Sequence, residues 1–258
     1  MGRALLPSPS HGGLCILSQQ NWTLACDDRA QGEGRILHTK VPDLFSMAKA
    51  EHIPATFLHI LKLPQTIVLL LGGPLAVILV SGSWVLAFVA SLALLAALRF
   101  LAKYPWKWFV AMSLHTDMSD ITKSYLSERG SGFWVAESKG QVVGMVGALP
   151  VKQPTLQKQQ LELLHLCVAP EHRGQGIAKA LVRTVLTFAR DQGYGEVVLT
   201  TSMLQHSALA LYQCLGFQKT SQFFSLKRWR LISLSQIQFT YCLPSAQVSQ
   251  ALEQGGGL

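Results

Sequence analysis

The sequence predicts an α/β protein in which a mixed central sheet has flanking helices and carries an inserted hydrophobic hairpin. Short apolar segments alternate with helix-like segments from residue 130 to residue 243, which is typical of a sheet covered by helices. The 33 residues of 66–98 include no charged side chain. Two glycines, Gly174 and Gly176, separate an apolar strand-like segment from an amphipathic helix-like segment.

The composition excludes several classes of protein. Of the 258 residues, 49% are hydrophobic and 14% are charged, and the mean hydropathy is +0.29, so the chain can bury a sizeable core. The five cysteines form no Cys-x-x-Cys pair, which disfavours a zinc ribbon or a dense disulfide framework, and no metal is expected. A net charge of +8 would permit a nucleic-acid partner, but the cations are dispersed and none is expected.

The uncharged segment is predicted to be a membrane hairpin. A spanning helix needs about 20 apolar residues for a hydrocarbon core of roughly 30 Å, whereas 33 residues in one helix would rise roughly 50 Å. A hairpin that turns at Ser81-Gly82-Ser83, or that breaks at Gly72-Gly73-Pro74, fits this length better. The alternative is a buried hairpin in a soluble core, but uncharged runs of this length are rare there.

The flanks of this segment indicate its orientation. Cytoplasmic loops of membrane proteins carry an excess of lysine and arginine, so basic residues on both sides favour two cytosolic ends. Trp106 and Trp108 lie where aromatic side chains meet a membrane surface. The basic residues are Lys49 and Lys62 before the segment and Arg99, Lys103 and Lys107 after it.

The remaining periodicity predicts the order of the other elements. A helix begins at the capping residues 116–120 and runs to Arg129, where Gly130 ends it. Lys139 and Gly140 form a two-residue hairpin turn. Strands are expected at 133–138, 141–149, 161–168, 196–201, 217–226 and 237–243, and later helices at 177–192 and 207–214.

The joint between the third of these strands and the next helix is the most informative stretch. Glycines let the backbone approach a bulky anion, and the first amides of a helix have no internal partners and face a favourable helix dipole. The joint therefore predicts a phosphate or pyrophosphate site. The P-loop pattern GxxxxGK[ST] and the dinucleotide pattern GxGxxG are both absent.

Arg173-x-x-Gly176-x-Ala178 matches the (Q/R)xxGx(G/A) signature of the GNAT acetyltransferases, which bind acetyl-coenzyme A (acetyl-CoA). The later stretch ALALYQCLGF, which begins at Ala208, resembles the second signature of these enzymes, a helix that carries a tyrosine and ends in Gly-Phe. The segments LLLGGPLAVILVSGSW, TDMSDITKSYLSERGS, FWVAES, HRGQGIAKALVRTV, FARDQGY and LGFQKT resemble the camello-like N-acetyltransferase 8 family over roughly residues 46–247.

The resemblance implies a domain organisation. Residues 1–40 differ from the usual start of the family and are expected to be a divergent, largely irregular N-terminus. The N-terminal helix region of the acetyltransferase fold is then 41–64, the membrane hairpin 65–102 and the catalytic core 103–244. The glycine-rich tail 245–258 is expected to be flexible.

The resemblance also implies the residues that hold acetyl-CoA. The amides of the glycine joint would bind its pyrophosphate, and the free backbone of the preceding strand would pair with the pantetheine arm and polarise the thioester carbonyl. Gln205 stands where many GNAT enzymes have an asparagine that bonds pantetheine. The joint residues are Arg173, Gly174, Gln175, Gly176, Ile177 and Ala178, and the strand residues are Leu166, Cys167 and Val168.

Three residues are candidates for proton transfer. Tyr212 matches the general acid of the family, since a phenol can protonate the leaving thiolate; the alternative is a packed aromatic near a helix end. Glu162 and His165 are candidates for the base that deprotonates the amine. Strand alternation would send these two to opposite faces, so only one is expected to serve, and each is otherwise a partly exposed strand residue.

The resemblance implies an acetyl-CoA-dependent N-acetyltransferase of the endoplasmic-reticulum membrane, or of the compartment between it and the Golgi, with a cytosolic catalytic domain and contact with membrane lipid. The expected acceptor is the α-amine of a cysteine S-conjugate, which would become a mercapturate. The alternative acceptor is a protein lysine, of secretory-pathway proteins or of histones. A different class of function, an acetyl-CoA-binding scaffold with weak catalysis, would fit the altered N-terminus.

Overall fold

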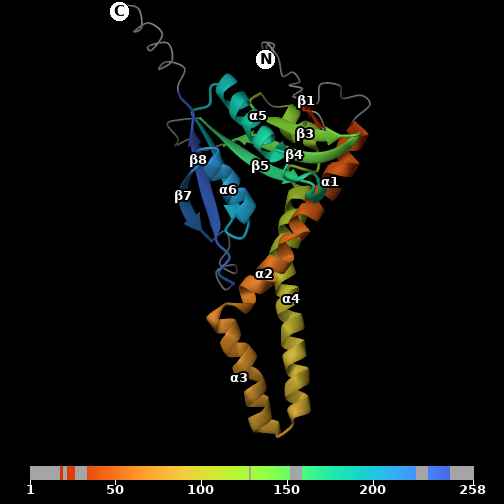
Figure 1. The fold of residues 1–258 in the computed structure, drawn as a ribbon, viewed down its shortest axis with the longest axis vertical. Coiled ribbons are helices and arrows are strands. Elements are labelled where there is room, and N and C mark those ends of the chain that lie inside the picture. Colours follow the sequence, from red (N-terminus) through yellow and green to blue (C-terminus); the bar gives the residue numbers. More distant parts are fainter. Residues whose placement is uncertain are drawn as a thin grey trace, which may run out of the picture. The chain divides into compact units, whose positions relative to one another are not determined.

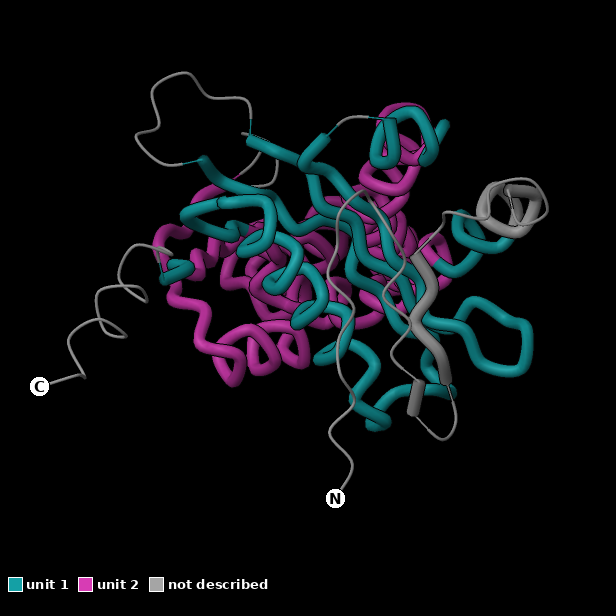
Figure 2. Tube along the Cα trace, turned by 90° about the horizontal axis from the view of Figure 1, so that it is seen from above, with its two compact units in different colours: residues 1–44, 120–198, 242–258 teal, residues 45–119, 199–241 magenta. Residues whose placement is uncertain are grey.

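The structure is a computed structural model that describes residues 18–19, 22–26, 34–127, 129–151, 159–224 and 232–244. The chain divides into two compact units (Figure 2). Within the described ranges, the first unit takes residues up to Leu44, Asp120–Val198 and the chain from Cys242, and the second takes Phe45–Ser119 and Leu199–Tyr241. Helix α1, Gly34–Ala50, passes from the first unit into the second.

The first unit contains an antiparallel run of five strands in the order of the sequence (Figure 1). The turn between β3 and β4 is the predicted Lys139-Gly140, with φ of 51° and 73°. Strand β6, Glu196–Ser202, starts in this unit and ends in the other. The five strands are β1 Ser18–Gln19, β2 Trp22–Cys26, β3 Gly132–Ser138, β4 Gln141–Pro150 and β5 Gln160–Val168.

Two glycines of β4 let different elements approach the two faces of the sheet. A Cβ atom on Gly144 would lie 3.0 Å from Ile177 and 3.2 Å from Leu181, so helix α5, Ile177–Asp191, packs on that face. A Cβ atom on Gly147 would lie 2.7 Å from the ring of the fully buried Tyr125. The core of the first unit therefore lies on both faces of β4.

The second unit is built on three helices: α2 His52–Leu61, α3 Pro64–Ser81 and α4 Trp84–His115. Gly82, with φ of 67°, and Ser83 join α3 to α4, and the Ser83 hydroxyl accepts a hydrogen bond from the Leu86 amide. Both α3 and α4 are long and apolar enough to cross a membrane, and most of their side chains are exposed. The turn lies at the first of the two predicted places, and α3 runs unbroken through the second.

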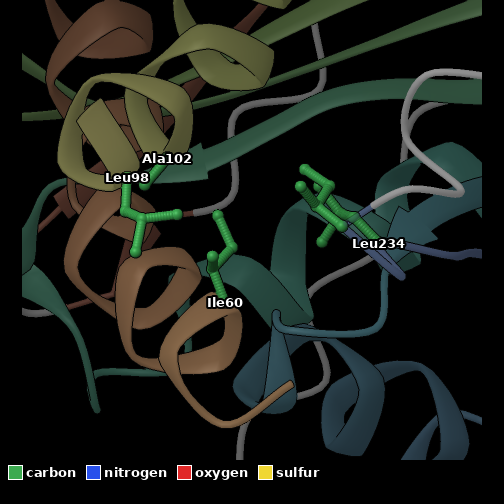
Figure 3. Packing of buried hydrophobic residues seen from close by; sticks show 5 residues of the cluster. Ile60, Leu98, Ala102 and Leu234 are labelled. Atoms are coloured by element: carbon green, nitrogen blue, oxygen red, sulfur yellow. The ribbon is translucent and has the colours of Figure 1, made fainter. Parts of the chain in front are cut away.

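Leu204, Ile232 and Leu234, which lie in later loops of the second unit, pack against α2 and α4. Figure 3 shows Ile60 of α2, Leu98 and Ala102 of α4, and Leu234 of a later loop turned toward one another in one buried cluster. Arg99 of α4 lies over the Phe57 ring of α2, 5.7 Å from its centre. The remaining elements of this unit are helix α6, His206–Cys214, and the antiparallel strands β7, Gln218–Phe223, and β8, Gln236–Cys242.

Most of the predicted elements are present, with ends shifted by one to three residues. The predicted helix at 116–129 is present in part, as the short η1 turn, Thr122–Leu126. The Asp120 carboxylate, one of the predicted capping groups, accepts a hydrogen bond from the Lys123 amide (2.9 Å) at its start. Thr116 instead caps the end of α4, with its hydroxyl donating to the Met112 carbonyl. Of residues 1–40, those that the structure describes form β1, β2 and the start of α1 at Gly34, and β2 pairs with β3; the rest of the predicted irregular N-terminus lies outside the described residues.

Candidate functional site

Strand β5 carries a bulge beside the glycine joint. Gly147 pairs with Leu164 and Met145 pairs with Cys167, so His165 and Leu166 together face a single residue, Val146. His165 takes φ of 55°, a left-handed conformation that is costly for a residue with a side chain. A bulge of this kind takes one backbone segment out of the ladder, and here that segment includes Leu166.

The bulge also changes which side chains share a face. Paired residues face the same side of a sheet, so Glu162, Leu164 and Cys167 lie together, as do Leu161, Leu163 and Val168. Because the regular alternation is interrupted at His165 itself, the register does not assign His165 to a face, and the expectation that Glu162 and His165 lie on opposite faces stays a prediction. Glu162 and His165 are both half-buried, and Cys167 and Val168 are buried.

The joint between β5 and α5 is held by its own backbone. The Ala169 amide donates to Val143 (2.8 Å), and the Arg173 amide donates to Pro170 (3.3 Å). The Arg173 side chain turns back to β5, where its Nε donates to the Val168 carbonyl (3.2 Å). Arg173 therefore stabilises the shape of the loop, and its amide is already engaged within the turn.

The amides beyond Arg173 are available for a ligand. Gly174 and Gly176 take φ of 75° and 82°, and a Cβ atom at either would meet nothing within 4 Å. The first bond of α5 runs from the Ala180 amide to Gly176. Within the part of the chain that the structure describes, no protein group accepts a hydrogen bond from the amides of Gly174, Gln175, Gly176, Ile177 and Ala178.

This loop fits the pyrophosphate of acetyl-CoA. Its glycines are exposed, open on their Cβ side and followed by the positive end of a helix dipole. The buried Ile177 side chain, 1% exposed, fixes the start of α5 against β4. Within the described residues, no three His, Cys, Asp or Glu side chains are grouped so that they could hold a metal ion.

Tyr212 and Gln205 lie in the second unit. Tyr212 is buried in α6, with its ring centre 5.7 Å from that of Phe217 and 6.0 Å from that of Phe239. Gln205 precedes α6, and its side-chain oxygen accepts hydrogen bonds from the Thr201 hydroxyl (2.8 Å) and the Ser202 amide (3.3 Å). The buried aromatic packing predicted as the alternative for Tyr212 is therefore present around it.

His52, which contacts Gln205, has no sequence pattern that predicts a functional role. Its Nε2 lies 2.9 Å from the Gln205 Nε2, although 153 residues separate the two. Trp106 is 7% exposed and donates to the Thr56 hydroxyl (2.7 Å). No local pattern connects residues so far apart, so only the folded chain reveals the contact.

Comparison with known proteins identifies the family of this chain. The sequence profile of the acetyltransferase (GNAT) family matches residues 98–217. Human N-acetyltransferase 8B is 64% identical over 210 residues, which cover 81% of this chain and 92% of that protein. Rat N-acetyltransferase 8 is 60% identical over 210 residues, covering 81% and 94%.

Among solved structures, an acetyltransferase of the GNAT family from Streptococcus pneumoniae is 15% identical, covers 49% of this chain and 75% of its own, and has a TM-score of 0.41. The strong sequence matches and the GNAT profile decide the classification. The chain belongs to the N-acetyltransferase 8 family, and it is an acetyl-CoA-dependent N-acetyltransferase with the GNAT fold, a mixed sheet with flanking helices.

Proposed function

We propose that this enzyme is anchored in a membrane and acetylates the α-amine of cysteine S-conjugates. The observation that carries the proposal is that Tyr212 and Gln205 belong to the same compact unit as the exposed apolar helices α3 and α4. A cysteine conjugate with an apolar S-substituent partitions toward a bilayer, because each apolar group leaves water with a gain in free energy. An acceptor of this kind is therefore concentrated beside the enzyme.

The hairpin is proposed to return the chain to the side from which it left. Strand β2 precedes α3 and α4, and β3 follows them, yet the two strands are hydrogen-bonded partners. The uncharged segment is bounded by Lys62 before α3 and by Arg99 in α4. Helix α3 rises roughly 27 Å, close to the roughly 30 Å of a hydrocarbon core. Two short crossings or a re-entrant hairpin both keep the flanks together, in the cytosol by their positive charge.

Acetyl-CoA supplies an activated acetyl group, and the chain's own groups are proposed to bind it and move protons. The amides of Gly174 to Ala178 hold the pyrophosphate, while Gln205 and the bulged backbone near Leu166 to Val168 hold the pantetheine arm. In the transfer, a bond forms between the acceptor nitrogen and the acetyl carbon, and the carbon–sulfur bond breaks. Glu162 or His165 takes the proton from the amine, and Tyr212 gives a proton to the departing thiolate.

The acceptor is tested by offering purified enzyme acetyl-CoA with S-benzyl-cysteine, with cysteine, or with a lysine-containing histone-tail peptide. Mass spectrometry should find N-acetyl-S-benzyl-cysteine as the main product. Cysteine is the matched control, because it has the same α-amine without the apolar group and should react more slowly. Acetylation of the peptide alone would instead support the protein-lysine alternative.

The pyrophosphate site is tested with Gly176→Asp, which adds a carboxylate in front of amides that favour an anion. The affinity for coenzyme A, measured by calorimetry, should fall by about tenfold or more, which corresponds to about 1.4 kcal/mol. Gly140→Asp is the control, because Gly140 has a similar φ of 73° and equally open surroundings but lies in the β3–β4 turn. Equal affinities in the two variants would contradict the assignment.

The role of Tyr212 is tested with Tyr212→Phe, which keeps the ring contacts with Phe217 and Phe239 and removes only the hydroxyl. The kcat should fall on the order of 10²-fold with little change in acetyl-CoA affinity, as expected for loss of a general acid. Tyr241→Phe removes a hydroxyl from the same aromatic cluster, 5.2 Å from Phe217, and should leave kcat unchanged. Wild-type turnover of the folded Tyr212→Phe protein would exclude Tyr212 from proton transfer.

The topology is tested by placing a tag at each terminus of the full chain in sealed microsomes. External protease should remove both tags, since both flanks of the hairpin face the outside of the vesicle. Protection of the C-terminal tag would refute the hairpin. So would an endoglycosidase-sensitive mass shift at Asn21, whose Asn-Trp-Thr sequence is a glycosylation acceptor pattern.

A further inference from the structure

The Gln205 amide has a fixed orientation in the structure. The Ser202 amide can only donate a hydrogen bond, so the Gln205 atom that faces it at 3.3 Å must be the oxygen. The Thr201 hydroxyl, which is part of a 5% exposed residue, donates to the same oxygen at 2.8 Å. The Gln205 nitrogen Nε2 consequently points the other way, toward His52.

The bond between Gln205 and His52 determines which proton His52 carries. The Gln205 Nε2 is a donor with two hydrogens and no acceptor capacity, so the His52 Nε2, 2.9 Å away, must accept. The His52 ring is therefore neutral, with its proton on Nδ1. This bond uses one hydrogen of the Gln205 Nε2. The second hydrogen meets no acceptor among the described residues, and Gln205 is half-buried.

The position of His52 is itself fixed by α2 and α4. Its ring lies against Trp106, with the ring centres 4.9 Å apart and the planes tilted by 38°. The Trp106 Nε1 donates to Thr56 Oγ1 at 2.7 Å, and Thr56 Oγ1 in turn donates to the His52 carbonyl at 2.9 Å. Trp106 and Thr56 are 7% and 0% exposed, so the histidine rests on a buried, hydrogen-bonded support.

We propose that His52 is a positioning residue that holds the Gln205 amide so that its second Nε2 hydrogen donates to a carbonyl of the pantetheine arm of acetyl-CoA. This inference rests on the proposed contact between Gln205 and pantetheine. Gln205 is longer than the asparagine common in GNAT enzymes and has one more rotatable bond, so it loses more entropy when it is ordered. The contacts with Thr201, Ser202 and His52 fix that bond before the ligand arrives, which favours binding.

The test measures the affinities of two ligands by calorimetry on the full-length protein. One is coenzyme A, and the other is 3′-phospho-ADP, which is coenzyme A without its pantetheine arm. His52→Phe keeps a ring against Trp106 and removes the acceptor, and should weaken coenzyme A binding by about 5- to 10-fold, the size of one hydrogen bond. It should leave the affinity for 3′-phospho-ADP unchanged. His52→Gln, which restores an acceptor oxygen, should recover most of the loss.

Two further variants separate a positioning role from a structural one. His59→Ala lies on the same helix, two turns on, and should leave both affinities unchanged. The double variant His52→Phe/Gln205→Ala should bind coenzyme A as weakly as Gln205→Ala alone, because His52 acts only through Gln205. If His52→Phe does not fold, His52→Ala serves in the same comparisons.

The outcomes distinguish this inference from the function on which it rests. If Gln205→Ala weakens coenzyme A binding but His52→Phe and His52→Ala do not, the inference is overturned and the proposed pantetheine contact stands. Additive losses in the double variant, or an equal loss of 3′-phospho-ADP affinity, would also overturn it. If Gln205→Ala leaves coenzyme A affinity unchanged, both the contact and the inference fail, while the pyrophosphate site tested at Gly176 is unaffected.

Discussion

The pairing of β2 with β3 constrains the whole course of the chain. Four ladder pairs, from Thr23 with Glu137 to Cys26 with Trp134, join residues that are separated by the entire helical segment. Whatever α1 to α4 do, Trp134 has to return beside Cys26. Two apolar helices connected by Gly82 and Ser83 satisfy this condition, because the second helix retraces the path of the first. A single crossing could not, since a backbone ladder does not form through a bilayer.

A second constraint is that buried polar groups need partners, and it determines how α2 and α4 are joined. The indole of Trp106 and the hydroxyl of Thr56 are both buried and bond each other. An unpaired group in such a place costs about 1–3 kcal/mol, so the two helices have one favoured register. The apolar cluster around Ile60 and Leu98 agrees with that register. Helix α4, which includes the second arm of the apolar hairpin, thereby contacts His52 through Trp106, and His52 contacts Gln205.

The sequence was most informative where periodicity is local. The helix α5 and the strands β3, β4 and β5 follow from their spacing of apolar residues, and the glycine joint follows from its position between them. The sequence does not distinguish between two positions for the turn of the hairpin, because Gly72-Gly73-Pro74 and Ser81-Gly82-Ser83 both contain helix-breaking residues. A proline inside a helix usually weakens it, yet α3 continues through Pro74.

Other features could not be predicted because the same residues serve different roles in different contexts. Thr116 is a good helix-capping residue, but the sequence does not say whether it closes the preceding helix or opens the next one. Tryptophan is typical of membrane surfaces, but the hydrogen bond from the Trp106 indole goes to Thr56, which is 50 residues away in the sequence. The contact of His52 with Gln205 joins two segments of the second unit that are 153 residues apart, so it forms only when that unit is folded. The bulge at His165 has no signature, because it is a property of the pairing between β4 and β5.

Three residues of the first unit with positive φ, His165, Gly174 and Gly176, lie at or just before the proposed cofactor loop. In the described residues, three side-chain-bearing residues have positive φ: Lys139 and Ser233 lie outside strands, whereas His165 lies within β5. Gly174 and Gly176 follow within eleven residues. Strained conformations persist where the surrounding structure enforces them and often accompany a ligand site.

Binding that depends on the main chain places little demand on side-chain identity apart from these glycines. A cofactor loop of this kind leaves the side chains elsewhere in the fold free to vary, so one fold can serve different functions.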